Sequence, residues 1–197
     1  MVLVIGGARS GKSAFAHSLA AGAGGEVCFI ATAEAKDAEM RERIRRHRLS
    51  RPKEWETLEL QGGIRLERFP ADDRVVIFDC LTVYLSNLMA AHGLDRLGEG
   101  EGLVPENKVE REAERVVEEA LSMLDELRHR CRELIVVSNE VGMGLVPPFR
   151  LGRLFRDLAG RINQKLAEEA DEVYLVAAGL PLCLKGGSGN GNAGRQG

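Results

Sequence analysis

The feature that most restricts the fold of this chain is its beginning: an apolar run, a glycine-rich loop and a Lys-Ser pair. Val2–Ile5 is short and rich in β-branched residues, and helical spacing starts at Lys12. Between them lies the pattern G-x-x-x-x-G-K-[ST], which predicts a phosphate-binding loop between a strand and a helix. Its residues are Gly6, Gly7, Ala8, Arg9, Ser10, Gly11, Lys12 and Ser13. The alternative is a glycine-rich turn that binds nothing.

Each residue type in this loop suits a nucleotide. Gly6 and Gly11 let the backbone turn so that its N–H groups converge on phosphate oxygens. The positive end of the following helix faces the same anion. Lys12 is expected to reach the β- and γ-phosphates, and the Ser13 hydroxyl to bind Mg²⁺.

The rest of the chain repeats the same alternation. Further β-branched runs occur at Val27–Ile30, Val75–Phe78, Leu134–Val137 and Val173–Val176. Helical spacing covers Lys12–Ala21, Lys36–His47, Leu81–Ala91, Asn107–Arg130 and Arg150–Ala170. Short apolar strands alternating with helices predict an α/β fold, with a mainly parallel sheet and helices on both faces.

Length and composition indicate one domain. The chain has 197 residues, and we expect a single folded unit over residues 1–185. Gly186–Gly197 is rich in glycine and predicts a disordered tail. His92–Glu106, rich in glycine and acidic residues, predicts a mobile surface connection.

The charge balance narrows the class of partner. Lys and Arg total 27, Asp and Glu total 30, and the net charge is −3, which disfavours nucleic acid and anionic membranes. No apolar run reaches the roughly 18 residues of a membrane span. The beginning of the chain does not look like a signal peptide, and the cysteines are dispersed as in a reducing compartment. We therefore expect a cytoplasmic protein.

A carboxylate ends the third apolar run. Asp79 follows Val75–Phe78, at the edge of the sheet where α/β proteins bind ligands. It resembles the aspartate that holds Mg²⁺ in phosphate-binding-loop enzymes. The alternative is that Asp79 caps the helix that begins near Leu81.

A basic segment holds the most unusual histidine. Residues 41–53 contain six arginines and one lysine. If Lys36–His47 is helical, Met40, Ile44 and His47 share one face. The segment is then a charged helix with a core histidine, a nucleic-acid patch, or a histidine facing a polyphosphate held by arginines. The net acidity and the single nearby aromatic, Trp55, weaken the second alternative, and the residues alone leave the others open.

Four blocks together resemble one family. They are GGARSGKS at Gly6–Ser13, the segment Ile30–Pro52, SNEVGMGLVP at Ser138–Pro147, and Leu154–Leu182. Over about Met1 to Lys185 the chain is similar to the bifunctional adenosylcobinamide kinase and adenosylcobinamide-phosphate guanylyltransferase family. The resemblance implies a RecA-like P-loop NTPase fold, Mg²⁺ as cofactor and a homotrimer. It also implies phosphorylation of adenosylcobinamide by ATP or GTP. GMP then passes from GTP to adenosylcobinamide phosphate, giving adenosylcobinamide-GDP and pyrophosphate.

The resemblance also implies roles for residues. His47 matches the family's H-R-x-x-R-P pattern as the histidine that carries GMP. Lys12 is the second implied catalytic residue. The implied nucleotide-binding residues beyond the loop are Thr32, Ala33, Glu34, Arg48, Arg51 and Glu59. Ser13 and Asp79 are the implied metal ligands, and Asn139 and Glu140 the implied substrate contacts. The alternatives are solvent-facing arginines, a surface carboxylate on a short strand at Glu59, and turn or capping chemistry at Asn139 and Glu140.

Two rival functions keep the phosphate-binding loop. One is a single-function small-molecule kinase in which His47 is structural. The other is a nucleotide-gated switch without catalysis, in which His92–Glu106 responds to the γ-phosphate.

Overall fold

The structure is a computed structural model that describes residues 1–33, 38–49, 51–60, 73–96 and 105–186. For residues 38–40, 43, 46 and 47 it describes the backbone alone. The predicted tail therefore lies outside the described residues, except for Gly186, and so does the middle of the predicted connection at 92–106.

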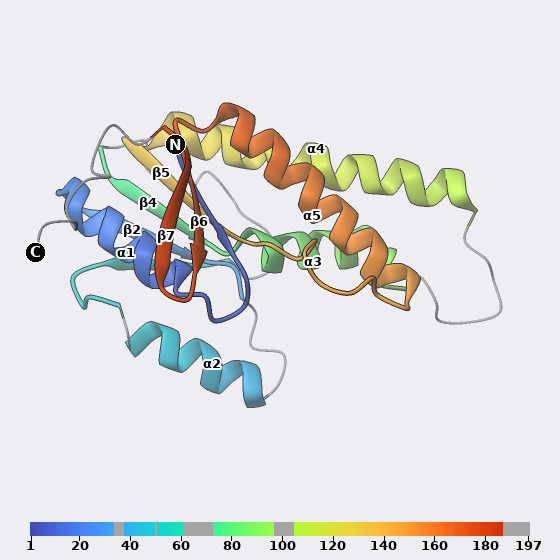
Figure 1. Cartoon of the computed structure of the whole chain (residues 1–197), viewed down its shortest axis with the longest axis horizontal. Helices are drawn as coiled ribbons and strands as arrows, with labels where there is room; N and C mark the ends of the chain where they lie inside the picture. Colours follow the sequence, from blue (N-terminus) through green and yellow to red (C-terminus); the bar gives the residue numbers. More distant parts are fainter. Residues whose placement is uncertain (34–37, 50, 61–72, 97–104, 187–197) are drawn as a thin grey trace, which may run out of the picture.

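One sheet forms the centre of the described part of the chain (Figure 1). Its order is β3-β2-β4-β5-β1-β6-β7. The strands are β1 (Val2–Gly6), β2 (Val27–Ala31), β3 (Glu56–Glu59), β4 (Val75–Asp79), β5 (Glu133–Asn139), β6 (Glu172–Ala177) and β7 (Leu180–Lys185). All neighbours pair in parallel except β6 and β7. The predicted mainly parallel sheet is confirmed.

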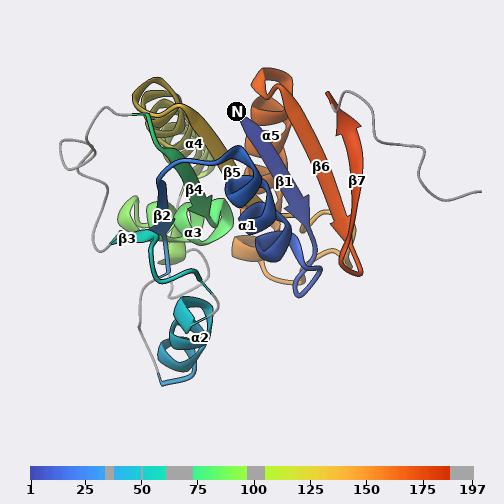
Figure 2. The same ribbon diagram turned by 90° about the vertical axis from the view of Figure 1, so that its left-hand side faces the viewer.

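Helices cover both faces of this sheet (Figure 2). α1 (Lys12–Ala23) covers one face, and α3 (Leu81–Ala91), α4 (Glu106–Arg130) and α5 (Arg150–Glu169) cover the other. A further helix, α2 (Ala38–Leu49), lies beyond the sheet. Successive residues of β4 serve opposite faces: Ile77 packs in the cluster with α1, and Phe78 in the cluster with α3, α4 and α5. Because both faces of the strand are buried, its sequence is a continuous apolar run.

The strand order positions the two phosphate-site elements. β5 lies between β1, which ends at Gly6, and β4, which ends at Asp79. An additional strand between these two is the arrangement of RecA-like P-loop folds, so the predicted fold class is confirmed. Because β1, β4 and β5 are parallel, their carboxyl ends meet at one edge of the sheet, where such folds bind ligands.

Two strands, both at the edges of the sheet, were not among the predicted apolar runs, although a short strand at Glu59 was one alternative. β3 has the sequence ETLE, and its two end residues are exposed, so it lacks an apolar run. β7 is exposed along its whole length and contains Pro181, which suits only an edge strand. A tight turn joins β6 to β7, with positive φ at Ala178 (51°) and Gly179 (82°), as hairpin turns require.

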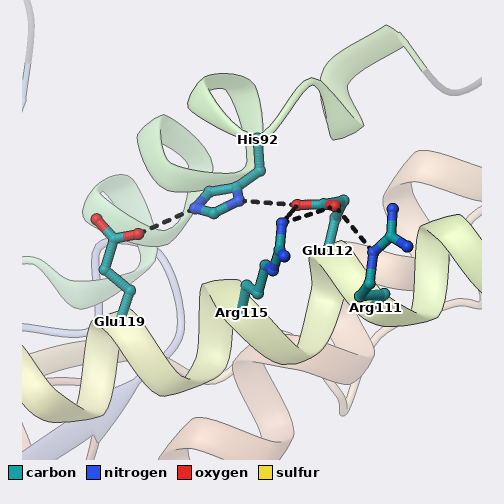
Figure 3. A network of polar contacts seen from close by, with 5 residues as sticks. All are labelled: His92, Arg111, Glu112, Arg115 and Glu119. Atoms are coloured by element: carbon teal, nitrogen blue, oxygen red, sulfur yellow. Dashed lines mark hydrogen bonds and ion pairs between the residues drawn. The ribbon is translucent and has the colours of Figure 1, made fainter.

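The connection after α3 begins with structure that was not predicted. A single 3-10 turn spans Leu94–Arg96, and Leu94 is buried. His92, for which the sequence indicated no role, ends α3 and reaches across to α4 (Figure 3). Its Nε2 lies 2.9 Å from Glu119 Oε2 and its Nδ1 3.3 Å from Glu112 Oε2. Hydrogen bonding to Glu119 is the main cause of a raised His92 pKa.

None of the helices in the described ranges is long and apolar enough to cross a membrane.

Candidate active site

The phosphate-binding loop is tightly packed where β1 ends. Gly6 lies in register between Asn139 of β5 and Val176 of β6. A Cβ added at Gly6 would sit 2.5 Å from the Val176 carbonyl oxygen and 2.6 Å from Ser10 Oγ, so only glycine fits. The Gly179 N–H donates to the Ser10 carbonyl at 2.8 Å, which ties the loop to the β6–β7 turn.

The start of α1 is open to an anion. Gly11 precedes the helix with φ 95°, no side chain caps it, and its first turn holds no acidic residue. The first N–H groups of a helix lack partners within the helix. Together with the helix dipole, they attract a phosphate to this end.

Lys12 and Ser10 face inward within the loop. The Lys12 side chain is buried, and its Nζ donates to the Gly7 carbonyl at 3.0 Å. Ser10 Oγ is buried and has no hydrogen-bond partner among the described residues. A buried hydroxyl without a partner is costly, and a phosphate oxygen is the type of acceptor that would satisfy it.

Thr32 joins the ends of β2 and β4. Its hydroxyl donates to the Cys80 carbonyl at 2.9 Å and accepts from the Cys80 N–H at 2.8 Å. The Thr32 N–H also donates to the Asp79 carbonyl at 3.3 Å. Thr32 therefore fixes the backbone next to Asp79, while Ala33 follows directly and Glu34 lies outside the described residues.

The alternative reading of Asp79 as a helix cap is wrong. Cys80 is the N-cap residue of α3, and no side-chain hydrogen bond caps the helix. The half-buried Asp79 ends β4 at the edge of the sheet where β1 meets the loop. Its carboxylate is not used to cap α3.

The oxygen donors at this edge fit a magnesium ion. Ser13 supplies a hydroxyl in the first turn of α1, and Asp79 a carboxylate at the end of β4. Magnesium prefers oxygen ligands and typically takes one or two carboxylates plus phosphate oxygens. Within the described residues no cluster of three His, Cys, Asp or Glu could hold a metal. Burial raises the pKa of the neighbouring Cys80 thiol, which keeps it neutral.

The implied substrate residues make internal contacts. Asn139 Nδ2 donates to Thr82 Oγ1 at 2.6 Å. The Glu140 N–H donates to the Gly6 carbonyl at 3.0 Å, and the Glu140 carboxylate accepts from the Gly142 N–H. Turn chemistry is thus present at Glu140, and substrate contact by either side chain stays a prediction.

The basic segment forms a helix beyond the sheet. α2 contains His47. The side chains of Met40 and His47, and with them the predicted shared face with Ile44, lie outside the described set. In both views α2 stands apart from the other helices (Figures 1 and 2). Its described arginines (Arg41, Arg45 and Arg48) are exposed.

Arg51, which follows α2 in the chain, lies against β2. Its guanidinium lies 3.5 Å from the centre of the Phe29 ring. Burial lowers the Arg51 pKa, and the charge of Asp79 opposes that shift. Arg48 instead pairs with Glu59 at 3.7 Å at the sheet edge. The structure therefore brings Arg51 near Asp79, and joins Arg48 to Glu59 by an ion pair.

Sequence reasoning missed the residues that support this edge. Asn87 Nδ2 donates to the Thr32 carbonyl at 3.2 Å. The buried Asn163 accepts from Ser138 Oγ at 2.7 Å and donates to the Asn139 carbonyl at 3.3 Å. A polar residue on the apolar face of α3 or α5 was the available signal, since buried amides need partners.

Comparison with known proteins gives one consistent result. The family model described as cobinamide kinase / cobinamide phosphate guanyltransferase matches residues 2–184. The bifunctional adenosylcobalamin biosynthesis protein CobU of Salmonella typhimurium is 41% identical over 94% of this chain and 99% of its own length. The protein of the same name in Escherichia coli is 40% identical over the same shares. The bifunctional adenosylcobalamin biosynthesis protein CobP of Pseudomonas aeruginosa is 42% identical over 93% of this chain and 96% of its own.

Among solved structures, an ATPase from the type III secretion system of pathogenic bacteria is similar with a TM-score of 0.48 and 10% identity. The match covers 92% of this chain and 56% of that one. Similarity at this level says nothing about function.

Proposed function

This chain belongs to the cobinamide kinase / cobinamide phosphate guanyltransferase family, and on that premise we propose how its residues carry out the family's two reactions. The observation that carries the proposal is the phosphate-binding loop. It is closely packed, open to an anion at the start of α1, and part of a chain that the family model matches almost throughout.

The first reaction is phosphorylation of adenosylcobinamide by ATP or GTP. The loop N–H groups and Lys12 hold the β- and γ-phosphates and stabilise the charge that develops on them. The aminopropanol hydroxyl oxygen of the acceptor attacks the γ-phosphorus and loses its proton to solvent. The bond from the γ-phosphorus to the β-phosphate oxygen breaks, and a nucleoside diphosphate leaves.

The second reaction transfers GMP through His47. A neutral imidazole nitrogen attacks the α-phosphorus of GTP, forms a P–N bond and releases pyrophosphate, while the ring loses one proton. A phosphate oxygen of adenosylcobinamide phosphate then attacks the same phosphorus. The P–N bond breaks, the ring regains a proton, and adenosylcobinamide-GDP forms.

A movement of α2 would bring His47 to the nucleotide. Among the described side chains of α2, none is buried, so these side chains lose little apolar burial when the helix shifts. Arg51, stacked on Phe29 near Asp79, would meet the phosphates as α2 approaches. Arg48 and Glu59 would exchange their ion pair for contacts to the nucleotide, together with Thr32, Ala33 and Glu34.

Ser13 and Asp79 would hold the magnesium ion of the nucleotide. Bound there, Mg²⁺ neutralises charge on the phosphates during transfer. Asn139 and Glu140, at the end of β5, would lie on the acceptor side of the loop. By family resemblance we also propose a homotrimer in the cytoplasm; the mass in solution tests the assembly.

Labelling with GTP tests the covalent step. With Mg²⁺ and GTP labelled at the α-phosphate, we expect the protein to acquire label that acid removes and base does not, as a phosphoramidate behaves. His47→Ala should abolish the label while phosphorylation of adenosylcobinamide persists. His129→Ala is the matched control, because His129 is an exposed histidine on α4, and it should label fully.

Each rival function predicts a different result. If wild-type protein phosphorylates adenosylcobinamide but stays unlabelled and releases no pyrophosphate, the chain is a kinase with a structural His47. Slow GTP hydrolysis that adenosylcobinamide does not accelerate would instead indicate a nucleotide switch.

A further inference from the structure

The connection between β5 and α5 presents large apolar side chains to solvent. Met143 is 80% exposed, Leu145 97%, Val146 64% and Phe149 76%. Single exposed apolar residues are ordinary, but several on one short loop mark a binding surface. Residues 141–149, which carry these four side chains, are called the apolar loop below.

This loop is held in shape and does not fold its side chains onto the core. Arg153 Nη1 donates to the Pro147 carbonyl at 3.1 Å and to the Pro148 carbonyl at 2.7 Å. The two prolines restrict the backbone, and the Glu140 carboxylate holds the Gly142 N–H at its start. The apolar side chains are therefore presented in advance, which lowers the entropy that binding costs.

The apolar loop leaves the sheet beside the phosphate-binding loop. The Glu140 N–H donates to the carbonyl of Gly6 at 3.0 Å, so a backbone hydrogen bond joins the starts of the two loops. Both views place the connection from β5 to α5 at the same edge of the sheet as the start of α1 (Figures 1 and 2). A molecule that receives a phosphoryl group from the nucleotide must approach this edge.

The chemistry of the loop selects the kind of molecule. Residues 141–149 read VGMGLVPPF and carry no charge, so they suit a neutral apolar surface and not a phosphate. The acceptor of the proposed function is a large macrocycle bordered by methyl groups and neutral amide arms, and its reacting hydroxyl ends one arm. A surface apart from the P-loop is needed to seat the macrocycle while that arm reaches the nucleotide.

We propose that Met143, Leu145, Val146 and Phe149 seat the corrin ring of the acceptor and so determine its affinity. This inference rests on the proposed function and adds the residues that select the acceptor. It predicts that the apolar loop affects the KM for the corrinoid and leaves nucleotide binding to the phosphate-binding loop.

The test is the double variant Met143→Ser/Leu145→Ser, with phosphorylation rates measured against adenosylcobinamide at saturating nucleotide. Losing the contact of two large apolar side chains should raise the KM for the corrinoid about tenfold. The KM for the nucleotide should change by less than about twofold. Leu184→Ser is the matched control, because Leu184 is 53% exposed and lies near the end of β7 away from the β6–β7 turn. Its KM for the corrinoid should match wild type.

Equilibrium dialysis of adenosylcobinamide against each protein, with nucleotide present, gives the same answer without catalysis. An unchanged corrinoid Kd in the double variant overturns the proposal, and so does an equal loss in Leu184→Ser. A change in the mass of the double variant in solution also overturns it, because a second copy of the chain then covers the loop. Failure of the proposed function looks different: wild-type protein would neither phosphorylate the acceptor nor acquire label from GTP.

Discussion

The phosphate-binding loop is packed between β5, β6 and the β6–β7 turn, whereas the described side chains of α2 are all exposed or only partly buried. Lys12 is 8% exposed, and Gly6 has no room for a Cβ. Leu49, at the end of α2, is 71% exposed. The phosphate-binding loop is thus built as a fixed receptor, whereas the described side chains of α2 bury little surface that would hold that helix in one place.

This difference matches the two reactions that the chain is proposed to run. Both need the triphosphate held in one position, and preorganised donors are most effective when they do not move during reaction. The imidazole, in contrast, must reach the α-phosphorus in one reaction and stay clear in the other. A fixed loop and a helix whose described side chains are exposed or only partly buried suit both demands.

The largest expected effect comes from removing the cation of the fixed receptor. Lys12→Ala should lower kcat/KM about 10³-fold in phosphorylation, and should lower the rate of labelling by GTP to a similar extent, because one lysine serves both. Lys165→Ala, an exposed lysine on α5, is the control and should retain both activities. Loss of one half-reaction alone would mean that the two do not share the loop.

A smaller effect is expected on the stability of the protein, and it should differ between variants in the phosphate-binding loop and variants in α2. Gly11 has φ 95°, and a Cβ there would lie 3.0 Å from the Gly179 Cα, so Gly11→Ala should lower the free energy of unfolding by about 1–3 kcal/mol. Leu49→Ala, on the exposed end of α2, should change it by no more than about 0.5 kcal/mol. Urea unfolding followed by circular dichroism measures both. Equal losses would contradict the contrast between a packed loop and a loose helix.

The sequence was sufficient for the parts of the fold that local patterns encode. The phosphate-binding loop and the strands over Val2–Gly6 and Val75–Asp79 follow from a short motif and from apolar runs that are buried on both faces. β7 could not be predicted, because a proline-containing and fully exposed strand has no alternation of burial to show in the sequence.

The contacts that support the site could not be predicted from the sequence, for another reason. Thr32 and Cys80 are distant in the chain and meet only because β2 and β4 pair. Arg51 could be expected near a phosphate from its family pattern, but its stacking on Phe29 depends on how the segment after α2 returns to the sheet. Contacts between distant segments of the chain can be identified only when the fold is known.

The smallest expected effect lies outside both regions, where α3 meets α4, and it shows what an ordinary surface contact contributes. His92 lies between Glu119 and Glu112, and Arg115 Nη1 also contacts Glu112 at 3.2 Å (Figure 3). The His92 pKa is raised, mainly by its hydrogen bond to Glu119. The pKa of Glu112 is lowered, mainly by its hydrogen bond to His92, so this carboxylate stays ionised near neutral pH.

Because the folded pKa of His92 exceeds the ordinary value of about 6.5, its stabilising contribution is complete below that pH and is lost as the pH rises through the folded value. Between about pH 6 and pH 8.5 the free energy of unfolding of wild type should therefore fall relative to that of His92→Gln. The fall should be at most about 1 kcal/mol, because His92 and Glu119 are partly exposed to solvent. Urea unfolding at both pH values measures this difference. Labelling by GTP should be equal in the two proteins at pH 7.5 or so, because His92 does not touch the phosphate-binding loop in the hydrogen bonds and ion pairs described for it. A pH dependence of the opposite sign would mean that His92 is neutral between its carboxylates, and a change in labelling would mean that the α3–α4 contact is coupled to the nucleotide site.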